Sequence, residues 1–210
     1  MDERWDLEDL HLFPHAFGQT YSFIYCFDTH LEPRKAERID VALQDYPWRG
    51  GYSYVNIYAV LQNQVPPADR PKIKAIHYAS PGWMDLLLNP EVALRIAKTV
   101  GIILGSLVAT VETFKRIDKL RLEIIRERRA KNVELTKLGA DQIKALNRLC
   151  DEAAKILGFG SLDRLNKRTK DPAITLNLLM AHWRRLKQIV TYVQKGKVHL
   201  PESSDQKDSE

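Results

Sequence analysis

The chain has 210 residues, 44% of them hydrophobic and 28% charged, and its formal net charge at pH 7 is +5. This composition is typical of an ordinary soluble protein that is large enough for one good core or two small ones. Its two cysteines, Cys26 and Cys150, fit neither a disulfide framework nor a zinc site, and its acidic first nine residues are the reverse of a targeting segment. We therefore expect a cytoplasmic protein.

The charge is distributed unevenly along the chain. Residues 1–111 contain 10 Lys or Arg against 13 Asp or Glu, a net charge of −3, and the last residues, 198–210, contain 1 against 4, again −3. Residues 112–197 contain 21 against 10, a net charge of +11. Such a field attracts nucleic acid, acidic protein or anionic lipid, although attraction alone gives no specificity.

Residues 1–18 are expected to form an acidic amphipathic leader that is broken at Pro14 and Gly18, because Pro clashes with the helix backbone. Three side chains in this leader have a spacing that can hold a metal on one helix face: Glu8, His11 and His15. Since Pro14 interrupts that face, we interpret the histidines as surface or packing residues and expect neither a metal nor another cofactor.

Residues 19–88 are expected to form a small α+β head in the order strand, helix, strand, strand. Alternating side chains predict strands over residues 20–28, 52–62 and 72–79, and Pro33 opens the helix between the first two. The segment before the next helix, residues 83–88, is interpreted as an apolar plug. A sheet this small needs a helix on its face to be stable.

Residues 89–131 are expected to form one long helix that provides this cover. Asn89, Pro90 and Glu91 are typical of a helix start, because they cap free amides, fit the first turn and complement the helix dipole. Apolar side chains then recur in alternating steps of three and four, among them Val100, Ile103, Leu107 and Phe114. A helix of this length spans ~60 Å and should join two regions or two subunits.

The middle of this helix carries small residues four apart, Gly101, Gly105 and Ala109, which let another helix come close. The uncharged run, residues 99–111, has 13 residues, whereas spanning a membrane takes about 20. Burial in a soluble bundle or dimer is therefore preferred over a membrane helix, and self-association through this stripe is expected.

Residues 132–197 are expected to form a basic helical bundle. A second helix is predicted over 134–157, and a third begins at Pro172 and is closed by Gly196 in the left-handed conformation. Residues 198–210 are expected to form a disordered acidic tail. The predicted fold is thus α+β: a small N-terminal β-α-β-β sheet covered by a long helix that continues into a C-terminal antiparallel helical bundle.

Known catalytic motifs are absent from the sequence, including Gly-rich phosphate loops, nucleophile elbows and metal-binding helices. A weak catalytic candidate remains at the predicted sheet, where Cys26 and Asp28 would share a strand face and His77 could lie on a neighbouring strand. His77 is more readily interpreted as a half-buried strand residue. This cluster would act as an enzyme site only if the three side chains converged in a pocket.

The basic residues are candidates for binding anions or nucleic acid. They fall in three groups: Arg126, Arg128, Arg129 and Lys131; Lys167, Arg168 and Lys170; and Arg184, Arg185 and Lys187. Contacts with phosphates would make affinity fall steeply with salt. Aromatic residues that could stack on bases are scarce nearby, and charge runs are also normal on a solvated helix surface.

These features favour a non-enzymatic interaction or scaffold protein that self-associates or binds a partner protein through its long apolar helix and basic bundle. A sequence-tolerant nucleic-acid-binding accessory protein is the alternative. A membrane-associated effector is a further alternative, because anionic lipid would suit both the apolar middle of the helix and the basic segment that follows it.

Overall fold

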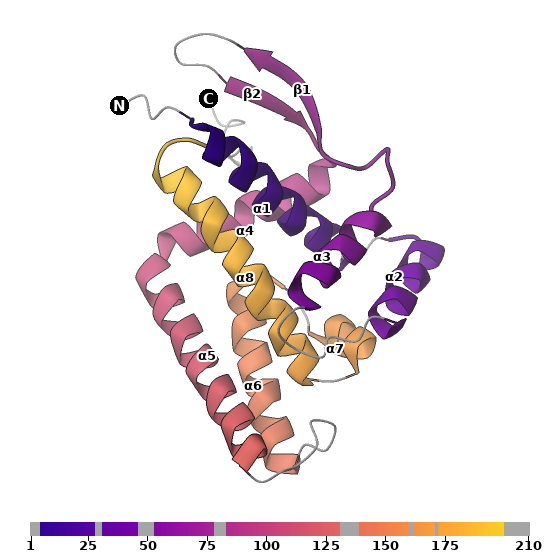
Figure 1. Ribbon diagram of the computed structural model, residues 1–210, viewed down its shortest axis with the longest axis vertical. Helices are drawn as coiled ribbons and strands as arrows, with labels where there is room; N and C mark the ends of the chain where they lie inside the picture. The colour runs from indigo at the N-terminus through magenta and orange to yellow at the C-terminus, as the bar shows by residue number, and fades with distance from the viewer. Residues whose placement is uncertain are drawn as a thin grey trace, which may run out of the picture. The chain divides into compact units, whose positions relative to one another are not determined.

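The computed structural model describes residues 5–27, 31–45, 53–77, 83–130, 139–159, 162–170 and 172–199. These residues are mostly helical and include one antiparallel sheet of two strands, in agreement with the coarse α+β class (Figure 1). The elements in chain order are α1 (Leu7–Cys26), α2 (Pro33–Asp45), α3 (Ser53–Gln64), β1 (Lys72–His77), β2 (Trp83–Leu87), α4 (Pro90–Gly105), α5 (Leu107–Ala130), α6 (Ala140–Ile156), α7 (Asp163–Thr169) and α8 (Pro172–Gln194).

The chain divides into two compact units. The first contains Met1–Gly101 and Arg184–Glu210, and the second contains Ile102–Trp183. The divisions fall inside α4 and α8, whereas the sequence placed its boundaries at the ends of predicted segments. Each of these two helices therefore contributes residues to both units.

Helix α1 corrects two predictions about the N-terminal segment. It runs from Leu7 through Pro14 and Gly18 to Cys26, so the break in the leader and the strand predicted over 20–28 are both wrong. Asp6 and Asp9 form a capping box at its start. Its C-terminal residues are apolar or aromatic on nearly every side and are all buried, and such a run is compatible with a buried helix as well as with a central strand.

Helix α3 corrects the strand predicted over 52–62. Tyr58, Leu61 and Val65 are all buried, and they are spaced by three and four residues, which is the helical period. The helix packs against α1 within the first unit. The apolar residues of this stretch also alternate as they would in a strand, so their spacing alone did not distinguish a strand from a helix.

The two strands form an antiparallel pair. Lys72 lies opposite Leu87 and His77 opposite Trp83, with an irregularity between Ile73 and Ala75. The strand predicted over 72–79 is confirmed for residues 72–77, and its partner is the segment that was interpreted as an apolar plug. The sheet order β-α-β-β is wrong, because the two earlier strands are helices.

The long helix predicted over 89–131 is divided into α4 and α5. Its predicted start is confirmed, since Asn89 Oδ1 accepts bonds from the backbone N–H groups of Glu91 at 3.1 Å and Val92 at 3.3 Å. The helix ends at Gly105, and α5 begins at Leu107 after a bend of 95°. The Ser106 hydroxyl donates to the Ile102 carbonyl at 2.9 Å, a local bond that competes with the helical backbone pattern.

Among the described residues, no single helix has the length and apolar character needed to cross a membrane. Helix α4 and the stretch Leu107–Ile124 of α5 meet that requirement only when they are taken together as a bent pair.

The second unit contains the helical core that the periodicity predicted. Helices α5 and α6 run side by side in opposite directions, and an ion pair links Arg116 to Glu152 (Figure 1). The ring of Phe114 stacks on Trp183 of α8 with centroids 4.3 Å apart. The second and third predicted helices are confirmed in α6 and α8, within the described residues, and Gly196 adopts a φ of 68°.

Candidate functional site

The structure does not support the catalytic candidate in the form predicted. Cys26 is fully buried on α1, where its thiol donates to the Leu61 carbonyl at 3.4 Å. Because Cys26 lies on a helix, strand alternation no longer places it on one face with Asp28. Asp28 and the side chain of His77 lie outside the residues that the structure describes.

The described residues contain no group of three or more His, Cys, Asp or Glu side chains that could hold a metal. The two leader histidines have ring centroids 6.3 Å apart, and His15 Nε2 is 2.8 Å from the side-chain nitrogen of Gln19. Burial lowers the pKa of His15, so this imidazole is held in its neutral form over a wider pH range.

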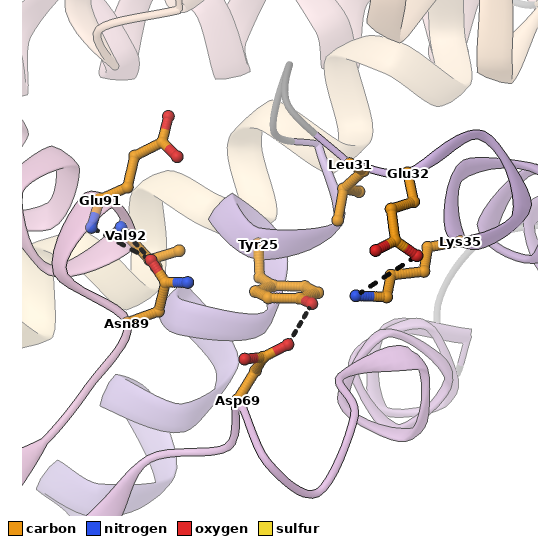
Figure 2. Close-up of a pocket in the computed structure, with 8 residues that line it drawn as sticks. All are labelled: Tyr25, Leu31, Glu32, Lys35, Asp69, Asn89, Glu91 and Val92. Carbon is orange, nitrogen blue, oxygen red and sulfur yellow. Dashed lines mark hydrogen bonds and ion pairs between the residues drawn. The ribbon is translucent and has the colours of Figure 1, made fainter.

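A polar pocket lies in the first unit, between α1, α2, the segment before β1 and the start of α4 (Figure 2). It encloses about 250 Å³ and is lined by Tyr25, Leu31, Glu32, Lys35, Asp69, Asn89, Glu91 and Val92. The Tyr25 hydroxyl donates to Asp69 Oδ2 at 2.7 Å, and the Tyr21 hydroxyl donates to the Asp69 carbonyl at 2.6 Å. Asp69 thus joins its loop to α1.

Two carboxylates that line this pocket, Glu32 and Glu91, are in ion pairs, the second with Arg95, which is not part of the lining. Lys35 lies 3.9 Å from Glu32, and Arg95 lies 3.3 Å from Glu91. Burial, followed by the bond to Asp69, raises the pKa of Tyr25 well above its ordinary value. Its phenol therefore stays protonated at neutral pH and is not an activated nucleophile, and the pocket is interpreted as a polar junction that orders the first unit.

A different surface emerges where α4 meets α5. We define the α4–α5 corner as Ile102, Gly105, Ser106, Val108 and Ala109, all of which belong to the second unit. Ile102 is 52% exposed and Val108 is 79% exposed, and the three small residues between and beside them are exposed as well. Part of the apolar middle of the predicted helix, Ile102 and Val108, is therefore open to solvent in the chain itself.

The predicted self-association residues separate into two sets. Val100, Ile103 and Phe114 are buried in the core, and Leu107 is half-buried. Gly101, Gly105 and Ala109 are exposed, and a Cβ atom added at either glycine would meet no atom within 4 Å. The small residues thus pack against nothing in the described chain, while the large ones form its interior.

Within either unit, the described members of the three predicted basic groups do not form one cluster. Within the second unit, the pairing of Arg116 with Glu152 places the end of α5, with exposed Arg126, beside the start of α6. Helix α7 follows the other end of α6, ~25 Å away along that helix. The residues on or just after α7 are exposed Lys167, half-buried Arg168 and exposed Lys170.

The remaining basic residues are placed as follows. Arg184 and Lys187 are exposed, and half-buried Arg185 lies over the Tyr58 ring, 5.6 Å from its centroid; all three belong to the first unit. Lys131 and the side chains of Arg128 and Arg129 lie outside the described residues. No single basic patch is therefore assembled within either unit from the residues described.

One charged surface was not predicted from the sequence. It begins at the α4–α5 corner and runs along the exposed face of α5. We define the α5 stripe as its exposed residues at successive steps of three and four: Val108, Glu112, Lys115, Lys119, Leu122 and Arg126. Three of these are cations and one is an anion, and that anion, Glu112, bonds Lys115 at 2.8 Å. The helical period could have found this face, because it lies opposite the buried seam of the same helix.

Comparison with protein-family models, with curated proteins and with solved structures found no match to this chain.

Proposed function

We propose that this chain is a non-enzymatic interaction protein that docks on its partner through the α4–α5 corner. The observation that carries the proposal is the exposure of Ile102 and Val108 beside small residues. Fully burying an exposed side chain of this kind contributes about 1.5–3 kcal/mol, and Ile102, which is 52% exposed, contributes less than Val108. The corner therefore contributes binding free energy to a complex, whereas it contributes little to the stability of the chain itself.

The non-enzymatic part of the proposal is supported by the state of the groups that could do chemistry. The Cys26 thiol is enclosed in the core, and the phenol of Tyr25 is bonded and kept protonated. Neither side chain has the exposure or the lowered pKa that an attacking group needs.

Site-specific photo-crosslinking tests the docking surface without assuming the partner. A photoreactive residue replaces Val108, and the matched control carries it at Val41, a 49% exposed valine on α2. We expect adducts in the cell from position 108 in clear excess over position 41. Equal yields at the two positions would reject the corner as the interaction surface.

Self-association is one form of this function, and the open glycines make it testable. Gly101→Leu and Gly105→Leu should both fold, because both positions are exposed and a Cβ atom added at either meets no atom within 4 Å. If two copies pack through the small residues, light scattering will show a dimer for the native chain and a monomer for the variants. An unchanged mass in folded protein rejects this form.

Nucleic-acid binding is the second candidate, and the cations of the α5 stripe are the observation that favours it. Lys119→Glu and Arg126→Glu should then weaken binding, and affinity for RNA or DNA should fall between low and physiological salt. Absence of binding even at low salt would remove this candidate.

A further inference from the structure

The partner of the corner can be inferred from the charges beside it. Given that the corner is the docking surface of the proposed function, we propose that it docks on an anionic lipid bilayer, with Ile102 and Val108 entering the interface and the cations of the α5 stripe contacting headgroups.

The arrangement of α5 fits such a surface. Val108 stands at the start of the exposed face, and Lys115 and Lys119 follow it seven and eleven residues later on the same face. These steps correspond to ~10 Å and ~16 Å along the helix. Glu112 lies between Val108 and Lys115 and bonds Lys115, and Lys119 and Arg126 continue the same face. A helix that lies in the plane of a bilayer interface buries its apolar side chains about 5–10 Å into the boundary of headgroups and acyl chains and keeps its cations at the headgroups.

Charge complementarity separates this partner from the others. A second copy of the chain would bring its own Lys115, Lys119 and Arg126 toward the same cations, and like charges oppose that contact. A nucleic acid would attract the cations but presents its phosphates, which give Val108 and Ile102 no apolar contact. An anionic bilayer supplies both anions and an apolar layer.

The chain around the corner has a matching composition. Helix α4 and residues Leu107–Ile124 are apolar enough to enter a membrane only as a bent pair, and the bend falls at the corner itself. The bend leaves Gly105, Ser106 and Ala109 exposed. These small side chains allow the backbone to approach the headgroup layer while the two larger ones insert.

Flotation with vesicles of defined composition tests the inference on the full chain. We expect binding to phosphatidylcholine vesicles that contain phosphatidylserine, little binding to pure phosphatidylcholine, and a decrease with salt. Lys119→Gln should weaken binding about five-fold, while Lys144→Gln, at an exposed lysine on α6, should not change it.

Two substitutions at the corner separate lipid from other partners. Val108→Ser should weaken vesicle binding several-fold, and Val41→Ser should leave it unchanged. Gly105→Leu should strengthen binding to lipid because it adds apolar surface, whereas it would disrupt a close helix pair. The variants alter exposed positions, and circular dichroism verifies that each is folded.

The outcomes distinguish the lipid inference from the proposed function. Vesicle binding that needs phosphatidylserine, Val108 and Lys119 supports both. Absence of vesicle binding, combined with crosslinks from position 108 to a second copy or another protein, overturns the lipid inference and leaves the docking surface. Vesicle binding that is indifferent to Val108→Ser also overturns the inference, and equal crosslinking at positions 108 and 41 overturns the docking surface as well.

Discussion

Helix α1 is continuous where its sequence predicted a break, whereas the α4–α5 segment is broken where its sequence predicted one continuous helix. Helix α1 continues through Pro14 and Gly18, two residues that normally interrupt helices, and the α4–α5 segment bends where a continuous helix was predicted. In α1, every residue from Thr20 to Phe27 is buried. At the bend, by contrast, the residues from Gly105 to Ser106 are exposed.

This difference shows what decides helix continuity in this chain. Burial of aromatic side chains along α1 stabilises each turn and exceeds the local cost of Pro14, which is about 3 kcal/mol in a helix interior. The exposed bend has no comparable packing, so the weak helix preferences of Gly105 and Ser106 decide the local structure.

The largest effect is expected from removing one aromatic side chain from α1, which tests whether burial of these side chains stabilises the helix. Phe23 is 1% exposed, and its ring centroid lies 4.7 Å from that of Phe27. We expect Phe23→Ala to lower the free energy of unfolding by about 3–5 kcal/mol because it leaves a cavity. Urea denaturation measures the change, with the exposed Leu12→Ala on the same helix as control. A loss below ~1 kcal/mol would show that burial does not hold α1 together.

A second buried residue, His182, should make the stability of the protein fall at acidic pH. His182 is fully buried on α8 near Phe159, and burial lowers its pKa from 6.5 to about 3. Below pH 6.5 the unfolded chain binds a proton that the folded chain does not, so this residue reduces stability as pH falls toward 3. The loss should reach about 3 kcal/mol at pH 4.

Unfolding measured between pH 7 and pH 4 tests this assignment. His182→Gln, which cannot titrate, should remove that part of the pH dependence even if it lowers stability at pH 7. The same slope in the variant and the native chain would show that His182 is not the group responsible.

Replacing the proline in α1 should stabilise the protein. Pro14→Ala restores a backbone donor toward Leu10 and removes the ring clash, although it also frees the unfolded chain. We expect a net gain of about 2 kcal/mol in the free energy of unfolding, the helix cost of about 3 kcal/mol less the unfolded-chain effect of about 0.4–1 kcal/mol. Pro66→Ala, in a loop, should instead lose about 0.4–1 kcal/mol, since only the unfolded-chain effect applies there. A loss at both prolines would mean that Pro14 is required for the path of α1.

The smallest effect is expected at the corner. Val108→Ser should change the free energy of unfolding by less than about 0.5 kcal/mol, because the side chain is 79% exposed. Phe114→Ala, on the buried face of the same helix, should cost about 3–5 kcal/mol. A large loss of stability in Val108→Ser would show that this side chain contributes to folding and is not part of a docking surface.

Much of the C-terminal half could be predicted from residue spacing. The seam that contains Ile103, Phe114 and Ile117 is buried as expected, and the cap at Asn89 and the left-handed Gly196 are also where the pattern placed them. The N-terminal half was predicted poorly because residues 20–26 and 53–62 satisfy the strand period as well as the helical one. Among the candidate site residues, spacing singled out Gly101 and Gly105, which are exposed but whose role in self-association stays a prediction, and it did not reveal the cationic face of α5.

The sequence by itself determined the buried seam from Ile103 to Ile117, the cap at Asn89 and the uneven charge, because these depend on neighbours within a few residues. Only the tertiary structure decided which distant residue covers each apolar side chain and which apolar side chains stay open. Phe114 and Val108 lie on one helix and are both hydrophobic, yet Trp183 covers the first and the second remains open. That choice depends on residues far away in the chain, since packing partners are brought together by folding and not by sequence distance.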